Sequence, residues 1–159
     1  MSRSSRITPG RVLASCGTAV YTLTLPAGWI SSRLSRSQPV LISRDQLVQV
    51  QLGTSATRQR PSTAGLRQMI SRLASKVGRF KSLTFSAVTV GRLRGISGTA
   101  TYARKTYRLV VVALPDRSGR HVFVLAAIVH SRATARDVQQ YKAVVASLRP
   151  MSRRRPPRR

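Results

Sequence analysis

The sequence is short of acidic residues. It contains no glutamate and no asparagine, and its only carboxylate side chains are Asp45, Asp116 and Asp137. Most acid–base catalysts and hard-metal sites depend on carboxylates, and glycosidases need two of them close together. The scarcity therefore argues against most enzymatic functions, and we expect no catalysis, no bound metal and no other cofactor.

Cysteine and long apolar segments are also scarce. Cys16 is alone, which excludes an internal disulfide, and no apolar run approaches the ~20 residues of a membrane-spanning helix. Residues 13–16 (Leu-Ala-Ser-Cys) match the lipobox of bacterial lipoproteins, but Arg3 and Arg6 interrupt the apolar stretch that export would need. We therefore expect a cytoplasmic protein if Met1 is the true start, whereas an apolar segment encoded upstream would restore export.

What the sequence does contain is positive charge on an ordinary apolar background. Its 29 Lys and Arg give a formal charge of +26, with Arg outnumbering Lys 25 to 4, while apolar residues make up 42% of the chain. This content favours a folded domain with a real core. We predict a basic flexible arm over 1–16, the domain over 17–150 and a disordered Arg/Pro-rich tail over 151–159. A GC-rich coding bias explains the excess of Arg over Lys but not the missing acids, so both a functional origin of the charge and drift stay open.

Hydrophobic periodicity predicts the secondary structure. Alternating or continuous apolar runs predict strands at 19–25, 40–43, 47–52, 83–90, 98–104, 107–114 and 122–129, with a polar loop at 53–62. The last four strands follow one another through short turns, which favours an antiparallel meander. Because 107–114 and 122–129 barely alternate, we place them at the centre of the sheet, covered on both faces.

Two amphipathic helices complete the pattern. The apolar residues from Leu66 to Val77 recur at helical spacing, with Thr63 as the expected N-cap and Gly78 as a left-handed closing residue. A second helix is predicted over 135–147, opened by a Thr134–Asp137 capping box. The predicted class is α+β: an α/β/α sandwich with a central antiparallel sheet flanked by helices.

Motifs for chemistry are absent. His121 and His130 flank one predicted strand, and at ~3.3 Å per residue they lie roughly 30 Å apart on opposite faces, so they cannot share a metal ion. The chain has no nucleophile elbow, phosphate-binding loop or dinucleotide-binding glycine motif.

Positive charge attracts polyanions, and phosphate contacts through Lys and Arg give salt-dependent, sequence-independent binding. Tyr102 and Tyr107 stand among basic residues, as in proteins that stack on single-stranded bases, although the same pattern suits sheet residues with solvated basic neighbours. The candidate anion-binding residues are Arg104, Lys105, Arg108, Arg153, Arg154, Arg155, Arg158 and Arg159. Because Arg is spread over the whole chain, no single recognition element stands out.

Residues 21–29 (Tyr-Thr-Leu-Thr-Leu-Pro-Ala-Gly-Trp) resemble the opening strand and Pro-x-Gly-Trp turn of the PsbP-like α/β/α sandwich superfamily. The segment 104–129 and the helix end at 144–149 resemble its last third. The resemblance implies a binding or scaffolding module without catalytic residues, located outside the cytoplasm or in the cell envelope. It also implies that Pro26, Gly28 and Trp29 are structural residues.

Two functions follow as hypotheses. The first is a monomeric, non-enzymatic module of the PsbP-like type that associates with a protein partner or with an anionic polymer or membrane surface. The alternative is a basic, nucleic-acid-associated protein that binds phosphates non-specifically through Arg. The dependence of binding on salt separates them.

Overall fold

The computed structural model describes residues 11–16, 19–35 and 38–150, and the structural statements below concern these residues. Their elements, in chain order, are β1 (Arg11–Cys16), β2 (Ala19–Thr24), β3 (Ile30–Ser35), β4 (Gln38–Ile42), β5 (Val48–Ala56), α1 (Thr63–Val77), β6 (Ser82–Val90), β7 (Leu93–Thr101), β8 (Tyr107–Pro115), β9 (His121–His130), α2 (Ala135–Ala146) and β10 (Arg149–Pro150). The predicted tail at 151–159 and residues 1–10 of the predicted arm lie outside the described part of the chain.

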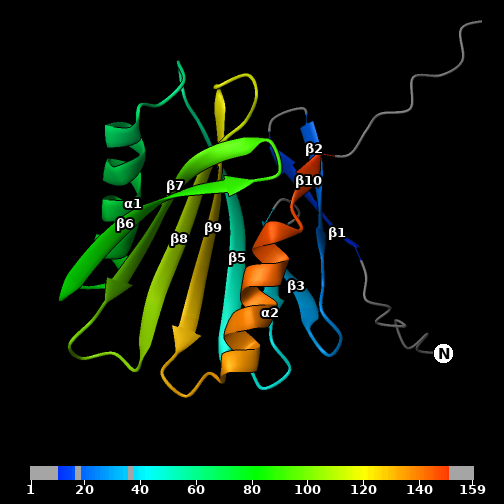
Figure 1. The fold of residues 1–159 in the computed structure, drawn as a ribbon, viewed down its shortest axis with the longest axis vertical. Coiled ribbons are helices and arrows are strands. Elements are labelled where there is room, and N and C mark those ends of the chain that lie inside the picture. Colours follow the sequence, from blue (N-terminus) through cyan, green and yellow to red (C-terminus); the bar gives the residue numbers. More distant parts are fainter. Residues whose placement is uncertain (1–10, 17–18, 36–37, 151–159) are drawn as a thin grey trace, which may run out of the picture.

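The strands form two antiparallel sheets (Figure 1). The large sheet has the order β3-β4-β5-β9-β8-β7-β6, and the small sheet has the order β1-β2-β10. The predicted meander is present as the consecutive pairs β6–β7, β7–β8 and β8–β9. Strand β9 lies at the centre of the large sheet with β8 beside it, because their continuous apolar runs supply buried side chains to both faces.

Different elements cover the two faces of the large sheet. On one face α1 packs against β7 and β8, with Leu66, Ile70 and Ala74 in the core. On the other face lie α2, which contacts β5 and β2, and the small sheet. Tyr21 of β2 meets Phe123 of β9 edge-on, with ring centroids 4.2 Å apart. The two helices thus lie on opposite faces of the sheet and over different strands (Figure 1).

The predicted α/β/α sandwich is wrong, because the fold is mostly β, with ten strands and two helices among the described residues. The strand predicted at 19–25 forms β2, which belongs to the separate small sheet and not to the large one. Residues 11–16 form β1 rather than part of a flexible arm, and they pair with β2 along its length. The layer that covers the face of the large sheet opposite α1 is therefore built partly from the small sheet and partly from α2. The hydrophobic periodicity of a single strand does not specify which strands it pairs with.

The helix ends depend on local hydrogen bonds. The N-cap of α1 is Ser62, whose hydroxyl accepts from the Gly65 amide at 3.1 Å, and not Thr63 as predicted. Gly78 has extended backbone instead of the expected left-handed conformation. The capping box of α2 is confirmed, since Thr134 and Asp137 each accept a hydrogen bond from the other's backbone amide.

The turn between β2 and β3 contains the three residues expected to be structural. The Trp29 amide donates to the Pro26 carbonyl at 3.1 Å, and Gly28 has a φ of 85°. A positive φ at the third position of such a turn favours glycine. The indole of Trp29 is fully buried, and its Nε1 donates to Oε1 of Gln140 on α2 at 3.0 Å. The turn thereby ties the start of β3 to α2.

Candidate functional site

All three aspartates form hydrogen bonds that stabilise nearby turns or a helix end. Asp45 accepts from the Ser43 hydroxyl at 2.8 Å and the Leu47 amide at 3.1 Å. Burial raises the pKa of Asp45, but hydrogen bonds with Asp137, Ser43 and backbone amides outweigh burial and bring the pKa below its ordinary value. Asp137 serves the capping box described above. These carboxylates are thus committed to turns and a helix end.

Asp116, in the turn between β8 and β9, contacts one serine and one histidine. Ser118 Oγ donates to Asp116 Oδ1 at 2.7 Å, and His121 Nδ1 lies 3.7 Å from Asp116 Oδ2. In a hydrolytic triad the imidazole stands between the hydroxyl and the acid, so that it can take the hydroxyl proton. Here the carboxylate stands between them, so His121 is not placed to activate Ser118.

The remaining titratable groups do not gather around a metal site. His121 and His130 stand at the two ends of β9 and pair with different strands, Ala56 of β5 and Tyr107 of β8. No group of three or more His, Cys, Asp or Glu suited to a metal ion occurs among the residues that the structure describes.

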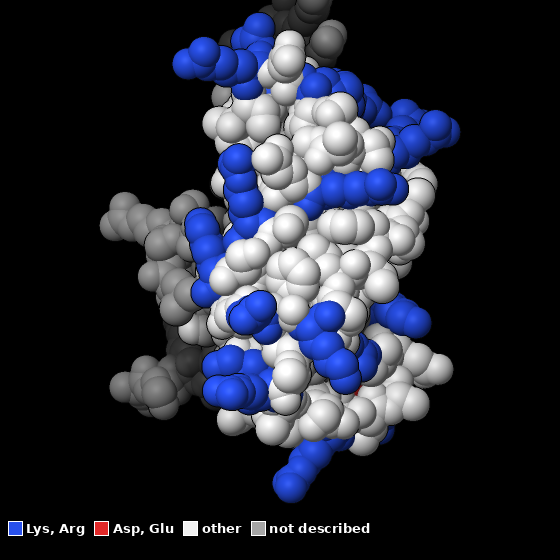
Figure 2. All heavy atoms as spheres, turned by 90° about the vertical axis from the view of Figure 1, so that its left-hand side faces the viewer, with Lys and Arg blue, Asp and Glu red and all other residues white. Residues whose placement is uncertain are grey.

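The cations have no acidic partners within the described residues, where the single charge pair is His121 with Asp116. Several Arg side chains contact neutral groups instead. Arg60 donates to the Arg117 carbonyl at 2.8 Å, and Arg67 lies over the Phe85 ring at 5.6 Å from its centroid. Neutral partners leave the positive charge uncompensated. Figure 2 shows Lys and Arg scattered from end to end over the side of the molecule that carries α1, with uncharged surface between them.

The cluster around Tyr102 does not form one surface. Arg104 and Lys105 are exposed in the turn between β7 and β8. Tyr102 is buried, and its hydroxyl donates to the Ala74 carbonyl of α1 at 2.8 Å, so the ring is not accessible for stacking on a base. Tyr107 and Arg108 are consecutive in β8 and point to opposite faces of the sheet. The predicted anion contacts Arg153, Arg154, Arg155, Arg158 and Arg159 lie outside the described residues.

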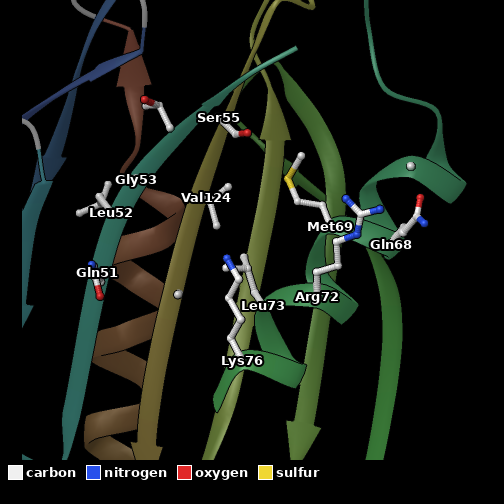
Figure 3. Close-up of a pocket in the computed structure, with 13 residues that line it drawn as sticks. Gln51, Leu52, Gly53, Ser55, Gln68, Met69, Arg72, Leu73, Lys76 and Val124 are labelled. Atoms are coloured by element: carbon white, nitrogen blue, oxygen red, sulfur yellow. The ribbon is translucent and has the colours of Figure 1, made fainter. Parts of the chain in front are cut away.

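A groove follows from the offset of the helices. Because α1 covers β7 and β8, the neighbouring strands β9 and β5 are left open on that face. We call this space the α1 groove; its volume is about 490 Å³. Figure 3 shows Met69, Arg72, Leu73 and Lys76 on the α1 side, Val124 on β9, and Gln51, Gly53 and Ser55 on β5.

A second space lies on the opposite face, beside α2. This α2 groove, about 410 Å³, lies over β6, β7 and β8 and includes Arg108, Tyr141 and Lys142 in its lining. Burial raises the pKa of Tyr141 to about 12, and the positive charge of Arg108 acts in the opposite direction. Of the predicted anion-binding residues, Arg108 thus lines this concave surface.

Sequence reasoning missed the α1 groove because it ended the strand before Gly53 and placed 53–62 in a loop. The period-2 burial of β5 ends at Leu52, since Thr54 and Ala56 are exposed, so the sequence carried only a weak signal for the longer strand. The pair Arg72 and Lys76, four residues apart on one side of α1, was visible as a charged stripe. Its position beside an open sheet face depends on packing.

Comparison with known proteins supports the fold alone. No protein-family model matches the chain, and no curated protein matches it. Eleven chains of solved structures match. One is a crystal structure from Bacteroides thetaiotaomicron VPI-5482, with a TM-score of 0.53 and 12% sequence identity. The match covers 83% of this chain and 45% of the other, so the chain spans less than half of that protein's length.

No helix in the described part of the chain combines the length and apolar character that crossing a bilayer requires.

Proposed function

We propose that the chain is a non-enzymatic binding or scaffolding module that holds an anionic partner on its positively charged surface. The observation that carries the proposal is the absence of any Lys or Arg paired with a carboxylate across the described residues. A surface whose cations are unpaired keeps its full attraction for an external anion. The local roles of Asp45, Asp116 and Asp137 also support a function without acid–base catalysis.

The partner class that we favour is a protein or anionic surface, with nucleic acid as the alternative. Nucleic-acid binding is supported by the same unpaired cations and by their wide distribution, which suits non-specific phosphate contacts. It draws no support from the aromatic cluster, because Tyr102 is buried beneath α1.

Binding of the full chain to three polyanions tests the proposal: heparin, anionic phosphatidylglycerol vesicles and a mixed-sequence DNA duplex, each over a range of NaCl. We expect salt-sensitive binding to heparin or to the vesicles, with neutral phosphatidylcholine vesicles as the control. Absence of binding to every polyanion at low salt contradicts the proposal.

The DNA series separates the two partner classes. A steep negative slope of log affinity against log salt for DNA, with no binding to vesicles, favours the nucleic-acid alternative. A slope near zero removes that alternative. Repeating the series without residues 151–159 shows whether the folded surface or the tail makes the contacts.

A further inference from the structure

Two small residues, Gly53 and Ala126, line the sheet side of the α1 groove. Gly53 of β5 pairs with Val124 of β9, and Gln51 pairs with Ala126, so these four share the open face. A Cβ atom added to Gly53 would meet nothing within 4 Å. Gly53 lies in a regular strand without a positive φ, so the backbone does not require glycine there. The empty space is a property of the groove and not of a strained turn.

The lining of the groove combines an apolar floor with cationic and polar walls. Met69, Leu73 and Val124 supply apolar surface, while Arg72 and Lys76 are exposed on the α1 wall (Figure 3). Within the described residues, neither cation has a hydrogen-bond or ion-pair partner. No acid lines the groove. Such a lining complements a molecule with an apolar body and one negatively charged end.

The size and topology of the groove favour a small molecule over a peptide. A peptide that adds as a strand pairs in the plane of the sheet at a free edge. The α1 groove instead lies over the face of the sheet, between α1 and the side chains of β5 and β9. The volume of about 490 Å³ lies within the roughly 300–1,000 Å³ of small-ligand sites.

We propose that the α1 groove binds a single-chain amphiphilic anion. Its alkyl tail lies over Val124 and Ala126 in the space left by Gly53, and its head group lies at the Arg72 and Lys76 wall. A guanidinium fork can donate two parallel hydrogen bonds to a carboxylate, and Lys76 adds a second positive charge. Binding at this site differs from general polyanion binding because the ligand needs an alkyl tail as well as a negative charge.

The probe is decanoate, added to the ¹⁵N-labelled full chain at about 0.15 M NaCl, where interactions between exposed charges more than about 8 Å apart are largely screened. Two-dimensional NMR follows the amide shifts. We expect saturable shifts centred on Gly53, Val124 and Ala126. Two controls separate the tail from the charge: acetate lacks the tail, and decyltrimethylammonium reverses the charge. Each should bind at least about tenfold more weakly than decanoate, and a tenfold difference corresponds to the burial of roughly two methylene groups.

Two pairs of variants test the assigned residues. Gly53→Leu fills the groove without straining the strand and should weaken decanoate binding by about tenfold or more. Its control, Gln49→Leu, places the same side chain on the same face of β5 outside the lining and should bind as the wild type does. Arg72→Gln with Lys76→Gln should weaken binding by about threefold to tenfold, whereas Arg132→Gln with Arg136→Gln removes equal charge elsewhere and should not.

Three outcomes overturn the proposal. Unchanged decanoate affinity in folded Gly53→Leu shows that the groove is not the site. Shifts centred on the α2 groove assign binding to the opposite face. Binding to phosphatidylglycerol vesicles without binding to free decanoate indicates a membrane surface contact. Because decanoate is a monovalent probe at screening salt, its failure leaves the polyanion proposal standing.

Discussion

At the residue scale, two glycines on the same face of the large sheet have opposite roles. Gly98 of β7 lies beneath α1, and a Cβ atom added there would come within 2.6 Å of Ile70 Cγ2. Gly53 of β5 lies where no helix covers the sheet, and an added Cβ would meet nothing within 4 Å. One glycine permits close packing of α1, and the other leaves the groove open.

Replacing these glycines by alanine should therefore have different effects. Gly98→Ala should lower the free energy of unfolding by about 1–3 kcal/mol, because α1 or Phe85 must shift to admit the methyl group. Gly53→Ala should leave stability unchanged or raise it by up to about 1 kcal/mol, because alanine loses less backbone entropy on folding. Urea unfolding of both variants measures the contrast, and equal stability losses would contradict the assigned packing.

At the element scale, sequence patterns predicted the individual helices and strands better than their ends. The capping box of α2 was readable because Thr134 and Asp137 are three residues apart and act on each other. The start of α1 was placed one residue late, because Ser62 and Thr63 both carry a hydroxyl and the sequence does not say which one is non-helical. Strand β3 was missed, since Ser31 and Ser32 break the apolar pattern of this edge strand.

The packing of α2 predicts a loss of stability at high pH. Burial raises the pKa of Tyr141 to about 12, against about 10 in an unfolded chain. The folded state therefore holds the Tyr141 proton more tightly, and the stability linked to it is present below pH 10 and lost as pH rises toward 12. Two pKa units correspond to at most about 2–3 kcal/mol.

Unfolding measured between pH 7 and pH 11 tests this linkage. Tyr141→Phe should lose less stability over that range than the wild type, because phenylalanine has no proton to release. An equal loss in both proteins would mean that the high-pH effect comes from another group, such as the buried Tyr102, whose pKa burial also raises.

At the scale of the whole molecule, the net charge opposes folding. The chain carries a formal charge of +26, and within the described residues no Lys or Arg is neutralised by an acid. Like charges brought together in a compact fold repel one another, and dissolved salt screens that repulsion. Surface ion pairs stabilise a protein by about 1 kcal/mol or less, and within the described residues no Lys or Arg has such a pair to offset the repulsion.

Thermal unfolding should therefore shift upward with salt. Between about 0.02 and 0.2 M NaCl, Tm should rise by about 2–4 °C for each kcal/mol of repulsion removed. Arg104→Gln with Lys105→Gln lowers the charge in an exposed turn, so this variant should have a higher Tm at low salt and a smaller rise. A Tm that is flat or falls with NaCl contradicts net repulsion.

The sequence by itself determined the terms that depend on composition and short-range pattern. The scarcity of acids follows from composition alone. Neighbouring residues specify the other three features: the apolar character of β8 and β9 on both faces, the Pro26–Trp29 turn and the α2 cap. Such features depend on local sterics, hydrogen bonds and periodicity, which neighbouring residues specify.

Only the tertiary structure decided which strands pair with one another and which part of the large sheet each helix covers. It placed β2 in a second sheet, paired residues 11–16 with it, and set α1 over β7 and β8 on one face of the large sheet and α2 near β5 on the other. The two grooves exist because each helix covers part of one face. That placement depends on contacts such as Gly98 with Ile70 and Trp29 with Gln140, whose partners are distant in sequence. An amphipathic pattern states that a face is buried but not which strand it is buried against.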